Sequence, residues 1–147
     1  MRTAIAGVGN TLMRDDGIGV YVARELMRLT LPADVEVIDA GTSADAAFGL
    51  ASADRVIVVD AARLGGSPGT IYRLTAEEAA ADGLRSCHDA GLIETLRTVP
   101  GSTAEVLVFG IEPQEIGWGL GLTGDVAAAV PHVVEIVKGE VKGAQCS

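Results

Sequence analysis

The sequence predicts an α/β domain, a three-layer α/β/α sandwich around a mixed, mostly parallel sheet of about five strands. Short apolar runs alternate with segments of helical periodicity along the whole chain. Hydrophobic residues make up 48% of the 147 residues but aromatic residues only 3%, so Val, Ile, Leu and Ala must form the core, as in parallel sheets covered by helices. This length fits a single domain over residues 1–147, and we expect residues 141–147 to be a flexible tail.

The first element is a strand at residues 3–9, an apolar run that stops at turn residues. After it, apolar side chains recur at spacings of four, four and three, which is one face of an amphipathic helix. That face consists of Ile18, Val22, Leu26 and Leu29. We expect Pro32 to end this helix.

The middle of the chain adds three strands. Residues 35–39 form the second strand, and a short helix follows at residues 44–50. Residues 55–60 are apolar on both faces, which is typical of a central strand. The strand at residues 70–74 follows too closely for a helical crossover, so it should pair antiparallel at or near an edge.

The last part of the chain returns to alternating helix and strand. Residues 76–82 form either one or two helical turns or a loop. A helix is expected at residues 88–99 and a strand at residues 105–110. The final helix should begin near Thr123 and end at about Val137.

The charge balance excludes two classes of partner. The chain has 11 Lys and Arg against 20 Asp and Glu, for a net charge of −9, and so lacks the basic patch that a nucleic acid or an anionic membrane requires. Cys87 and Cys146 are too few for a disulfide framework, which favours a reducing compartment. With neither a signal peptide nor a spanning segment, we expect a soluble cytoplasmic protein, and in the absence of a heptad pattern a monomer.

The first strand ends in a glycine pattern that partly matches a dinucleotide-binding loop. Gly7-Val-Gly9-Asn10 could bring the backbone close to a pyrophosphate. Leu12, however, stands where the third glycine belongs, and the carboxylates of Asp15 and Asp16 would repel the phosphates. Nucleotide binding is therefore kept as an alternative hypothesis for the function.

Three polar side chains can meet where the parallel strands end. Asp15 and Asp16 precede the first helix, where an N-cap is one interpretation. Asp60 ends the central strand, and a buried carboxylate there needs a cation, a donor or a metal. His88 opens the helix that leads to the next strand. Two carboxylates and one imidazole, from Asp16, Asp60 and His88, suit a divalent ion that also accepts water or substrate ligands.

Six short motifs follow one another along the chain: Gly7-Val-Gly-Asn10-x-Leu12-x-x-Asp15-Asp16-Gly17-x-Gly19, Asp39-x-Gly41-Thr42, Asp60-Ala, Ser86-x-His88-x-x-Gly91-Leu92, Gly110-Ile111-x-Pro113 and Gly121-Leu122-Thr123. In order and spacing, from Arg2 to about Glu140, they resemble the motifs of the hydrogenase maturation proteases. The resemblance implies an endopeptidase that removes the C-terminal extension from the precursor of a [NiFe]-hydrogenase large subunit after nickel insertion.

The resemblance also implies the site. Asp16, Asp60 and His88 would surround Ni²⁺ that arrives within the substrate, although other divalent ions could occupy the same place. The same side chains would be the catalytic residues, and the loop at Gly41 and Thr42 would hold the C-terminal segment of the precursor. Family members often carry Glu at the position of Asp16, so a shorter acid here would need a closer approach or a bridging water. A factor that binds the precursor without cleaving it is the remaining alternative.

Overall fold

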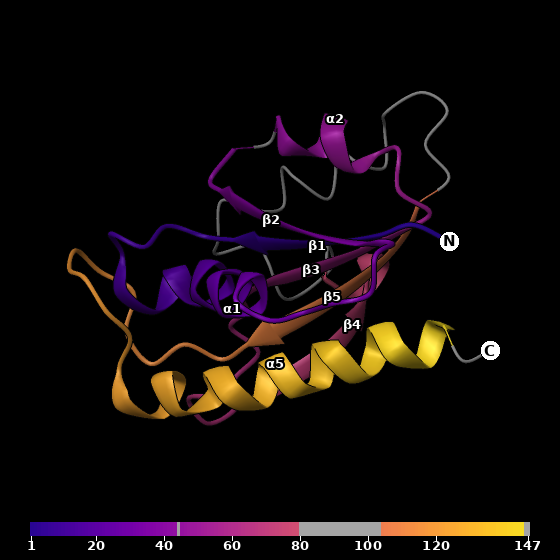
Figure 1. Ribbon diagram of the computed structural model, residues 1–147. Helices are drawn as coiled ribbons and strands as arrows, with labels where there is room; N and C mark the ends of the chain where they lie inside the picture. Colours follow the sequence, from indigo (N-terminus) through magenta and orange to yellow (C-terminus); the bar gives the residue numbers. More distant parts are fainter. Residues whose placement is uncertain (44, 80–103, 146–147) are drawn as a thin grey trace.

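The computed structural model describes residues 1–43, 45–79 and 104–145 of the chain. A five-stranded sheet with the order β2-β1-β3-β5-β4 lies between helices on its two faces (Figure 1). The α/β prediction with a mixed sheet is therefore confirmed. The elements are β1 (Thr3–Val8), η1 (Arg14–Gly17), α1 (Ile18–Met27), β2 (Val35–Gly41), α2 (Ala46–Leu50), β3 (Arg55–Ala61), β4 (Ile71–Thr75), α3 (Ala76–Glu78), β5 (Glu105–Ile111) and α5 (Gly124–Gln145), where η1 is a 3-10 helix.

β3 is the central strand, as its two apolar faces predicted. It pairs in parallel with β1 on one side and with β5 on the other, and all seven of its residues are buried. β2 lies at one edge, parallel to β1. β4 forms the opposite edge and pairs antiparallel with β5, which confirms the expectation from its short connection.

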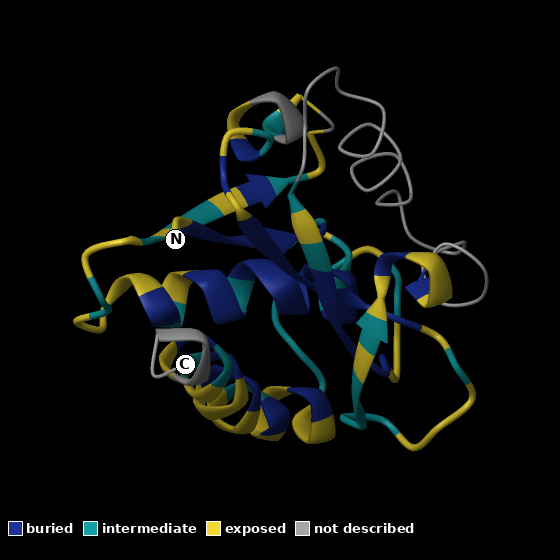
Figure 2. Ribbon diagram, turned by 90° about the vertical axis from the view of Figure 1, so that its right-hand side faces the viewer, coloured by how far each residue is buried: buried dark blue, intermediate teal, exposed yellow. Residues whose placement is uncertain are grey.

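Successive side chains of β3 enter two separate cores, as the period of two in a strand requires. Val56 and Val58 pack in a cluster that includes Leu50 of α2. Ile57 and Val59 pack in the other cluster, against α1 and α5. Figure 2 shows the buried residues running through the middle of the sheet, with exposed residues on the outer sides of the helices. Two cores on opposite faces of one sheet confirm the three layers.

α1 confirms most of the predicted helical face but ends sooner than expected. Ile18, Val22 and Leu26 are all fully buried. Leu29, the fourth predicted member, lies outside the helix and is 41% exposed, so its assignment to the buried face was wrong. The N–H of Leu29 donates to the carbonyl of Leu26 at 3.1 Å, three residues back, which tightens the last turn of the helix.

α5 is longer than predicted, because it continues past Val137 to Gln145. Residues 141–145 are therefore helical rather than a flexible tail. The extra turns are retained because Val137 and Val141 are both buried in the core below β3 and β5. No helix among the described residues is long and apolar enough to cross a membrane.

The segment after β4, for which the sequence allowed either a helix or a loop, begins as the short helix α3. Thr75 caps α3: its hydroxyl accepts a hydrogen bond from the N–H of Glu78 at 3.2 Å, and the Glu78 carboxylate accepts one from the N–H of Thr75. The helix predicted at residues 88–99 lies outside the described residues, as does the predicted beginning of α2 at residue 44.

Candidate functional site

Asp16 is held at the carboxyl end of β1 by the loop that follows this strand. Its side chain is 3% exposed, and its Oδ2 accepts a hydrogen bond from the backbone N–H of Asn10 at 3.0 Å. Gly9 has a φ of 135° and lies directly against η1, where a Cβ would be 1.9 Å from the carbonyl oxygen of Asp16. Only glycine fits this position, so the Gly9-Asn10 turn fixes both the backbone and the carboxylate of Asp16.

Two further glycines bring α1 and η1 down onto the sheet. A Cβ on Gly19 would lie 2.0 Å from the carbonyl oxygen of Val59, and a Cβ on Gly7 would lie 2.3 Å from the carbonyl oxygen of Gly19. The first turn of α1 therefore packs directly on β1 and β3, and η1 contacts β3. The glycines that resembled a dinucleotide loop serve here as close helix–strand contacts.

Asp60 lies on β3 at the same end of the sheet as Asp16. It is fully buried, and its Oδ1 accepts a hydrogen bond from the N–H of Ala61 at 2.7 Å. Its position pairs with Gly110 of β5. Alternation with Val56 and Val58 places Asp60 on the sheet face covered by α2, and burial makes interactions of its charge strong.

Asp15 is fully buried, and hydrogen bonds occupy both of its carboxylate oxygens, so it is a poor candidate for a metal ligand. Oδ2 accepts from the N–H groups of Gln114 and Glu115, both at 2.9 Å, and from the Thr123 hydroxyl at 2.7 Å, while Oδ1 accepts from the Thr123 N–H at 2.8 Å. Burial alone would raise the pKa of Asp15, but these hydrogen bonds outweigh it and hold the pKa below its usual value of 3.8. Of the two adjacent acids, Asp16 is therefore the better candidate ligand.

Neither acid caps α1, so the N-cap interpretation was wrong. The N-cap residue is Gly17, and no side chain makes a capping hydrogen bond there. The four-residue 3-10 helix η1 separates the β1 loop from α1 and directs Asp15 and Asp16 into the protein instead.

Gly41 and Thr42 line a cavity of about 270 Å³ at the carboxyl ends of β1 and β2. Gly41 has a φ of 55°, and its carbonyl accepts a hydrogen bond from the N–H of Gly9 at 2.8 Å, which joins the two loops. An ion pair of 3.6 Å between Arg24 and Asp39 lies on the wall of the cavity. The cavity is lined by Gly9, Asn10, Thr11, Leu12, Val20, Arg24, Asp39, Gly41 and Thr42.

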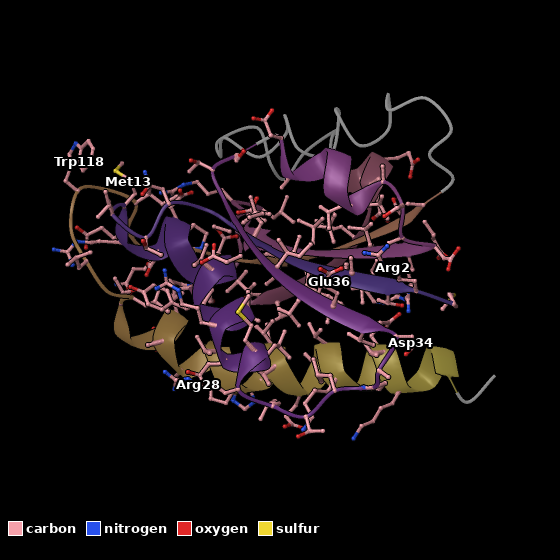
Figure 3. The ribbon with its side chains drawn as sticks, turned by 45° about the horizontal axis from the view of Figure 1, so that its top comes forward. Arg2, Met13, Arg28, Asp34, Glu36 and Trp118 are labelled. Carbon is pink, nitrogen blue, oxygen red and sulfur yellow. The ribbon has the colours of Figure 1, made fainter. Side chains whose placement is uncertain are left out.

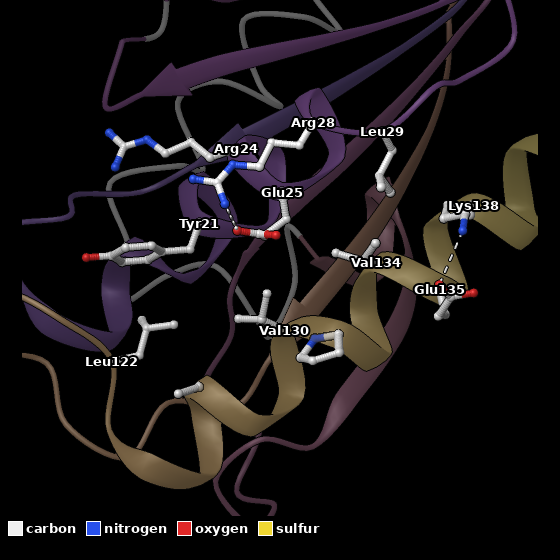
Figure 4. Close-up of a pocket in the computed structure, with 12 residues that line it drawn as sticks. Tyr21, Arg24, Glu25, Arg28, Leu29, Leu122, Val130, Val134, Glu135 and Lys138 are labelled. Atoms are coloured by element: carbon white, nitrogen blue, oxygen red, sulfur yellow. Dashed lines mark hydrogen bonds and ion pairs between the residues drawn. The ribbon is translucent and has the colours of Figure 1, made fainter.

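A larger cavity of about 680 Å³ lies between α1 and α5 and contains none of the predicted site residues. Figure 4 shows Tyr21 and Glu25 on α1 opposite Val130 and Val134 on α5. Arg24 lines both this cavity and the smaller one, and its guanidinium carbon is 5.9 Å from the centre of the Tyr21 ring. Of the two cavities, the smaller one therefore contains residues that the sequence predicted for the site, Gly41 and Thr42.

Glu112, directly after β5, is a buried acid that the sequence reasoning missed. It is 5% exposed, and its Oε1 accepts hydrogen bonds from the N–H groups of Leu64 and Gly66 and from the Tyr72 hydroxyl, at 2.8, 3.0 and 2.8 Å. Burial, then the hydrogen bond and charge of Glu112, raise the pKa of Tyr72. An acid directly after an apolar strand, the signal that singled out Asp60, could have identified Glu112. Its contacts give it the role of fastening the loop after β3.

The structure brings two of the three predicted ligands, Asp16 and Asp60, to one end of the sheet. His88 lies outside the described residues, so its place beside them remains a prediction. Within the part of the chain that is described, no group of three or more His, Cys, Asp and Glu side chains could hold a metal ion.

Comparison with known proteins adds the family. A model of the hydrogenase maturation proteases matches residues 20–140 of the chain. The chain belongs to the hydrogenase maturation protease family. A Methanocaldococcus jannaschii protein provisionally named as such a protease is 37% identical over 146 residues, which span 94% of this chain and 95% of the relative.

Two comparisons with Escherichia coli extend this result, one of sequence and one of structure. The hydrogenase 2 maturation protease is 33% identical over 145 residues, covering 93% of this chain and 88% of its own. The solved structure of the hydrogenase maturating endopeptidase HybD superimposes with a TM-score of 0.89 at 30% identity, covering 98% of this chain and 94% of that one. This hydrogenase maturation protease therefore shares fold and family along nearly its whole length, which favours proteolysis over nucleotide binding.

Proposed function

We propose that this protein removes the C-terminal extension from the precursor of a [NiFe]-hydrogenase large subunit after nickel has been inserted there. The observation that carries the proposal is the position of Asp16 and Asp60, two buried carboxylates at one end of the sheet. Asp16 is hydrogen-bonded to Asn10, which lines the cavity bordered by Gly41 and Thr42. Family membership supplies the activity class and the kind of partner. A cytoplasmic location is part of the same proposal.

The donor set fits a nickel ion that belongs to the substrate. Carboxylate oxygens from Asp16 and Asp60 and an imidazole nitrogen from His88 are ligands that a divalent ion accepts, and three protein donors leave positions for those of the precursor. Within the precursor, the ion can polarise a carbonyl or a water as a Lewis acid. The four hydrogen bonds to Asp15 leave Asp16 as the acid of this pair for the role.

The residues of the chain position the peptide and handle the proton. The Asn10 N–H holds one oxygen of Asp16, so this carboxylate has a fixed direction before the substrate arrives. Asp60, buried on β3, orients the metal-bearing site or takes a proton, and His88 acts as ligand or proton carrier. Gly41 and Thr42 hold the extended segment of the precursor along their cavity.

The test compares nickel-loaded with nickel-free precursor. We expect cleavage of the loaded form only, and loss of cleavage with Asp16→Asn or Asp60→Asn while precursor binding is retained. Asp125→Asn, an exposed acid on α5, is the matched control and should cleave normally. Equal cleavage of both precursors would contradict the requirement for nickel. Processing that survives in both site variants would leave only the factor that binds without cleaving.

A further inference from the structure

Three large apolar side chains are exposed at the end of the protein that carries the candidate site. Leu12 is 54% exposed, Trp118 79% and Leu120 73%. Trp118 and Leu120 lie on the loop between β5 and α5, and Leu12 lies on the loop after β1. We refer to these three residues as the apolar patch. Soluble proteins rarely leave large apolar side chains grouped in water without a binding role.

The two loops of the apolar patch are joined through their backbones. The N–H of Gly119, between Trp118 and Leu120, donates to the carbonyl of Leu12 at 2.9 Å, and the N–H of Arg14 donates to the carbonyl of Gly119 at 3.0 Å. Met13 and Gly119 form a parallel bridge. Figure 3 shows Met13 and Trp118 side by side at one end of the molecule.

Hydrogen bonds to a buried carboxylate also hold the backbone of the loop that carries Trp118 and Leu120. The buried carboxylate of Asp15 binds the N–H groups of Gln114 and Glu115 at one end of the loop and Thr123 at the other. Arg14 keeps a φ of 50°, which is uncommon outside glycine, and its guanidinium packs against Gly119. A preformed backbone loses little entropy when it binds, so a loop that is held at Gly119 and exposes a tryptophan suits recognition.

The apolar patch is continuous with the cavity at Gly41 and Thr42, because Leu12 belongs to both. A peptide held in that cavity and leaving it past Leu12 would reach Trp118 and Leu120. A second copy of the chain is a poorer occupant, since each copy carries a net charge of −9 and the two would repel.

We propose that the apolar patch docks an apolar segment of the precursor next to the segment held in the cavity, and thereby selects the substrate. This inference rests on the proposed function. Leu12, Trp118 and Leu120 are positioning residues here: they bind the chain that flanks the cleaved bond and do not touch the reacting atoms.

The first test separates binding from chemistry. For nickel-loaded precursor we expect Trp118→Ala to raise KM at least about tenfold with kcat nearly unchanged, since a central tryptophan is often a dominant contact. Leu120→Ala should act in the same direction, and Trp118→Phe should recover part of the loss because it restores an apolar ring. Ile136→Ala, which removes an exposed apolar side chain of α5 outside the patch, is the control and should leave KM unchanged.

The second test uses the fluorescence of Trp118, the single tryptophan of the sequence. In an Asp60→Asn background, nickel-loaded precursor should shift the emission to shorter wavelength and protect it from iodide quenching. Precursor binding, seen by co-purification, without either change would overturn the docking proposal.

The outcomes distinguish the two proposals. If the wild-type protein cleaves the precursor while Trp118→Ala and Leu120→Ala retain its KM, the docking surface is wrong and the proposed function stands. If the precursor protects Trp118 but is never cleaved, the docking surface stands and the proposed function fails. A dimer in sedimentation that Trp118→Ala converts to a monomer would assign the apolar patch to a second copy and overturn the proposal.

Discussion

The carboxylate of Asp15 accepts hydrogen bonds from both the backbone N–H and the hydroxyl of Thr123, at 2.8 and 2.7 Å, across 108 residues of sequence. The same carboxylate binds the N–H groups of Gln114 and Glu115, so one buried acid joins η1 to both ends of the loop between β5 and α5. The carboxylate of Asp16, its neighbour, instead accepts a hydrogen bond from the N–H of Asn10. Two adjacent acids of the same type thus have different partners: Asp15 binds the loop between β5 and α5, and Asp16 binds the loop after β1.

Asp15→Asn should lower the free energy of unfolding by about 3 kcal/mol at neutral pH, because the amide cannot accept all four hydrogen bonds and buried donors are left unsatisfied. Urea denaturation followed by circular dichroism measures the loss. Asp125→Asn, on the surface of α5, should change stability by less than about 0.5 kcal/mol. A stable Asp15→Asn protein would show that the loop is anchored elsewhere.

The pH dependence of this loss has a definite sign. The pKa of Asp15 is lower in the folded protein than its usual 3.8, so the unfolded chain binds the proton more readily. The stabilising contribution of the carboxylate is present above the unfolded pKa and disappears as pH falls through the lower folded value. The difference in unfolding free energy between wild type and Asp15→Asn should therefore shrink in acid. A constant difference down to the lowest pH at which both proteins fold would contradict this assignment.

Gly19→Ala should destabilise the protein by at least about 2 kcal/mol, because the added methyl would overlap backbone carbonyls of β1 and β3 that cannot move independently. It should also displace η1 and so weaken processing of the precursor. Gly139→Ala is the matched control, since the added Cβ would have no described atom within 4 Å apart from its chain neighbours and the backbone of its own helix, and the site is inside α5. There the same substitution should stabilise by about 0.5–1 kcal/mol. Thermal unfolding of both variants checks the contrast.

For the described residues, the spacing of apolar side chains and the turn residues between them predicted the order of the strands and of the two longer helices. The run at residues 55–60 is apolar at every position before Asp60 except Arg55, and it is the central strand; the short connection to β4 correctly predicted its antiparallel pairing. The predictions that Leu29 is buried and that the last helix ends at about Val137 were wrong. The local pattern of apolar residues does not show where the chain leaves a core or how far that core extends. Val141 continues the helix by packing, which depends on β3 and β5 rather than on its neighbours in sequence.

The site was predictable in part for a similar reason. Strand ends located Asp16 and Asp60, because parallel strands bring their carboxyl ends to one edge. The sequence could not show that the carboxylate oxygens of Asp15 are occupied by hydrogen bonds from a loop about a hundred residues away. Nor could it show that Gly7 and Gly19 serve helix packing, since a glycine pattern after a strand is the same for a phosphate loop and for a close contact.

Tyr72 should titrate at higher pH than an ordinary tyrosine, because burial and the neighbouring Glu112 carboxylate both oppose the phenolate. A Tyr21→Phe background leaves Tyr72 as the sole tyrosine for ultraviolet difference titration. In that background Glu112→Gln should lower the pKa of Tyr72 by removing the adjacent charge, while burial keeps this pKa above its usual value of 10.0. If Glu112→Gln leaves the titration unchanged, the Tyr72 hydroxyl is not bonded to this carboxylate in solution.

Glu140 connects the C-terminal part of α5, which extends beyond the predicted end of the helix, to the sheet. Its carboxylate pairs with Arg55 of β3, which is 8% exposed, and with Arg73 of β4 at 2.8 Å. The Arg73 hydrogen bond lowers the pKa of Glu140, burial opposes this, and the Arg55 hydrogen bond lowers it further. Above the unfolded pKa, near 4.5, the pair therefore stabilises the fold, and the effect is lost as pH falls through the folded value.

Removing this carboxylate leaves Arg55 buried without its acid, so Glu140→Gln should cost about 2–3 kcal/mol of unfolding free energy at neutral pH, less than a fully buried pair because Glu140 is partly exposed. Glu135→Gln removes the acid of an exposed pair with Lys138 on the same helix and should cost less than about 0.5 kcal/mol. A double-mutant cycle of Glu140→Gln with Arg55→Met measures the interaction energy between the two side chains apart from the effect of each single substitution. If both glutamate variants lose equal stability, Glu140 acts only through the charge of α5, and the packing of Val137 and Val141 alone must hold this end of the helix.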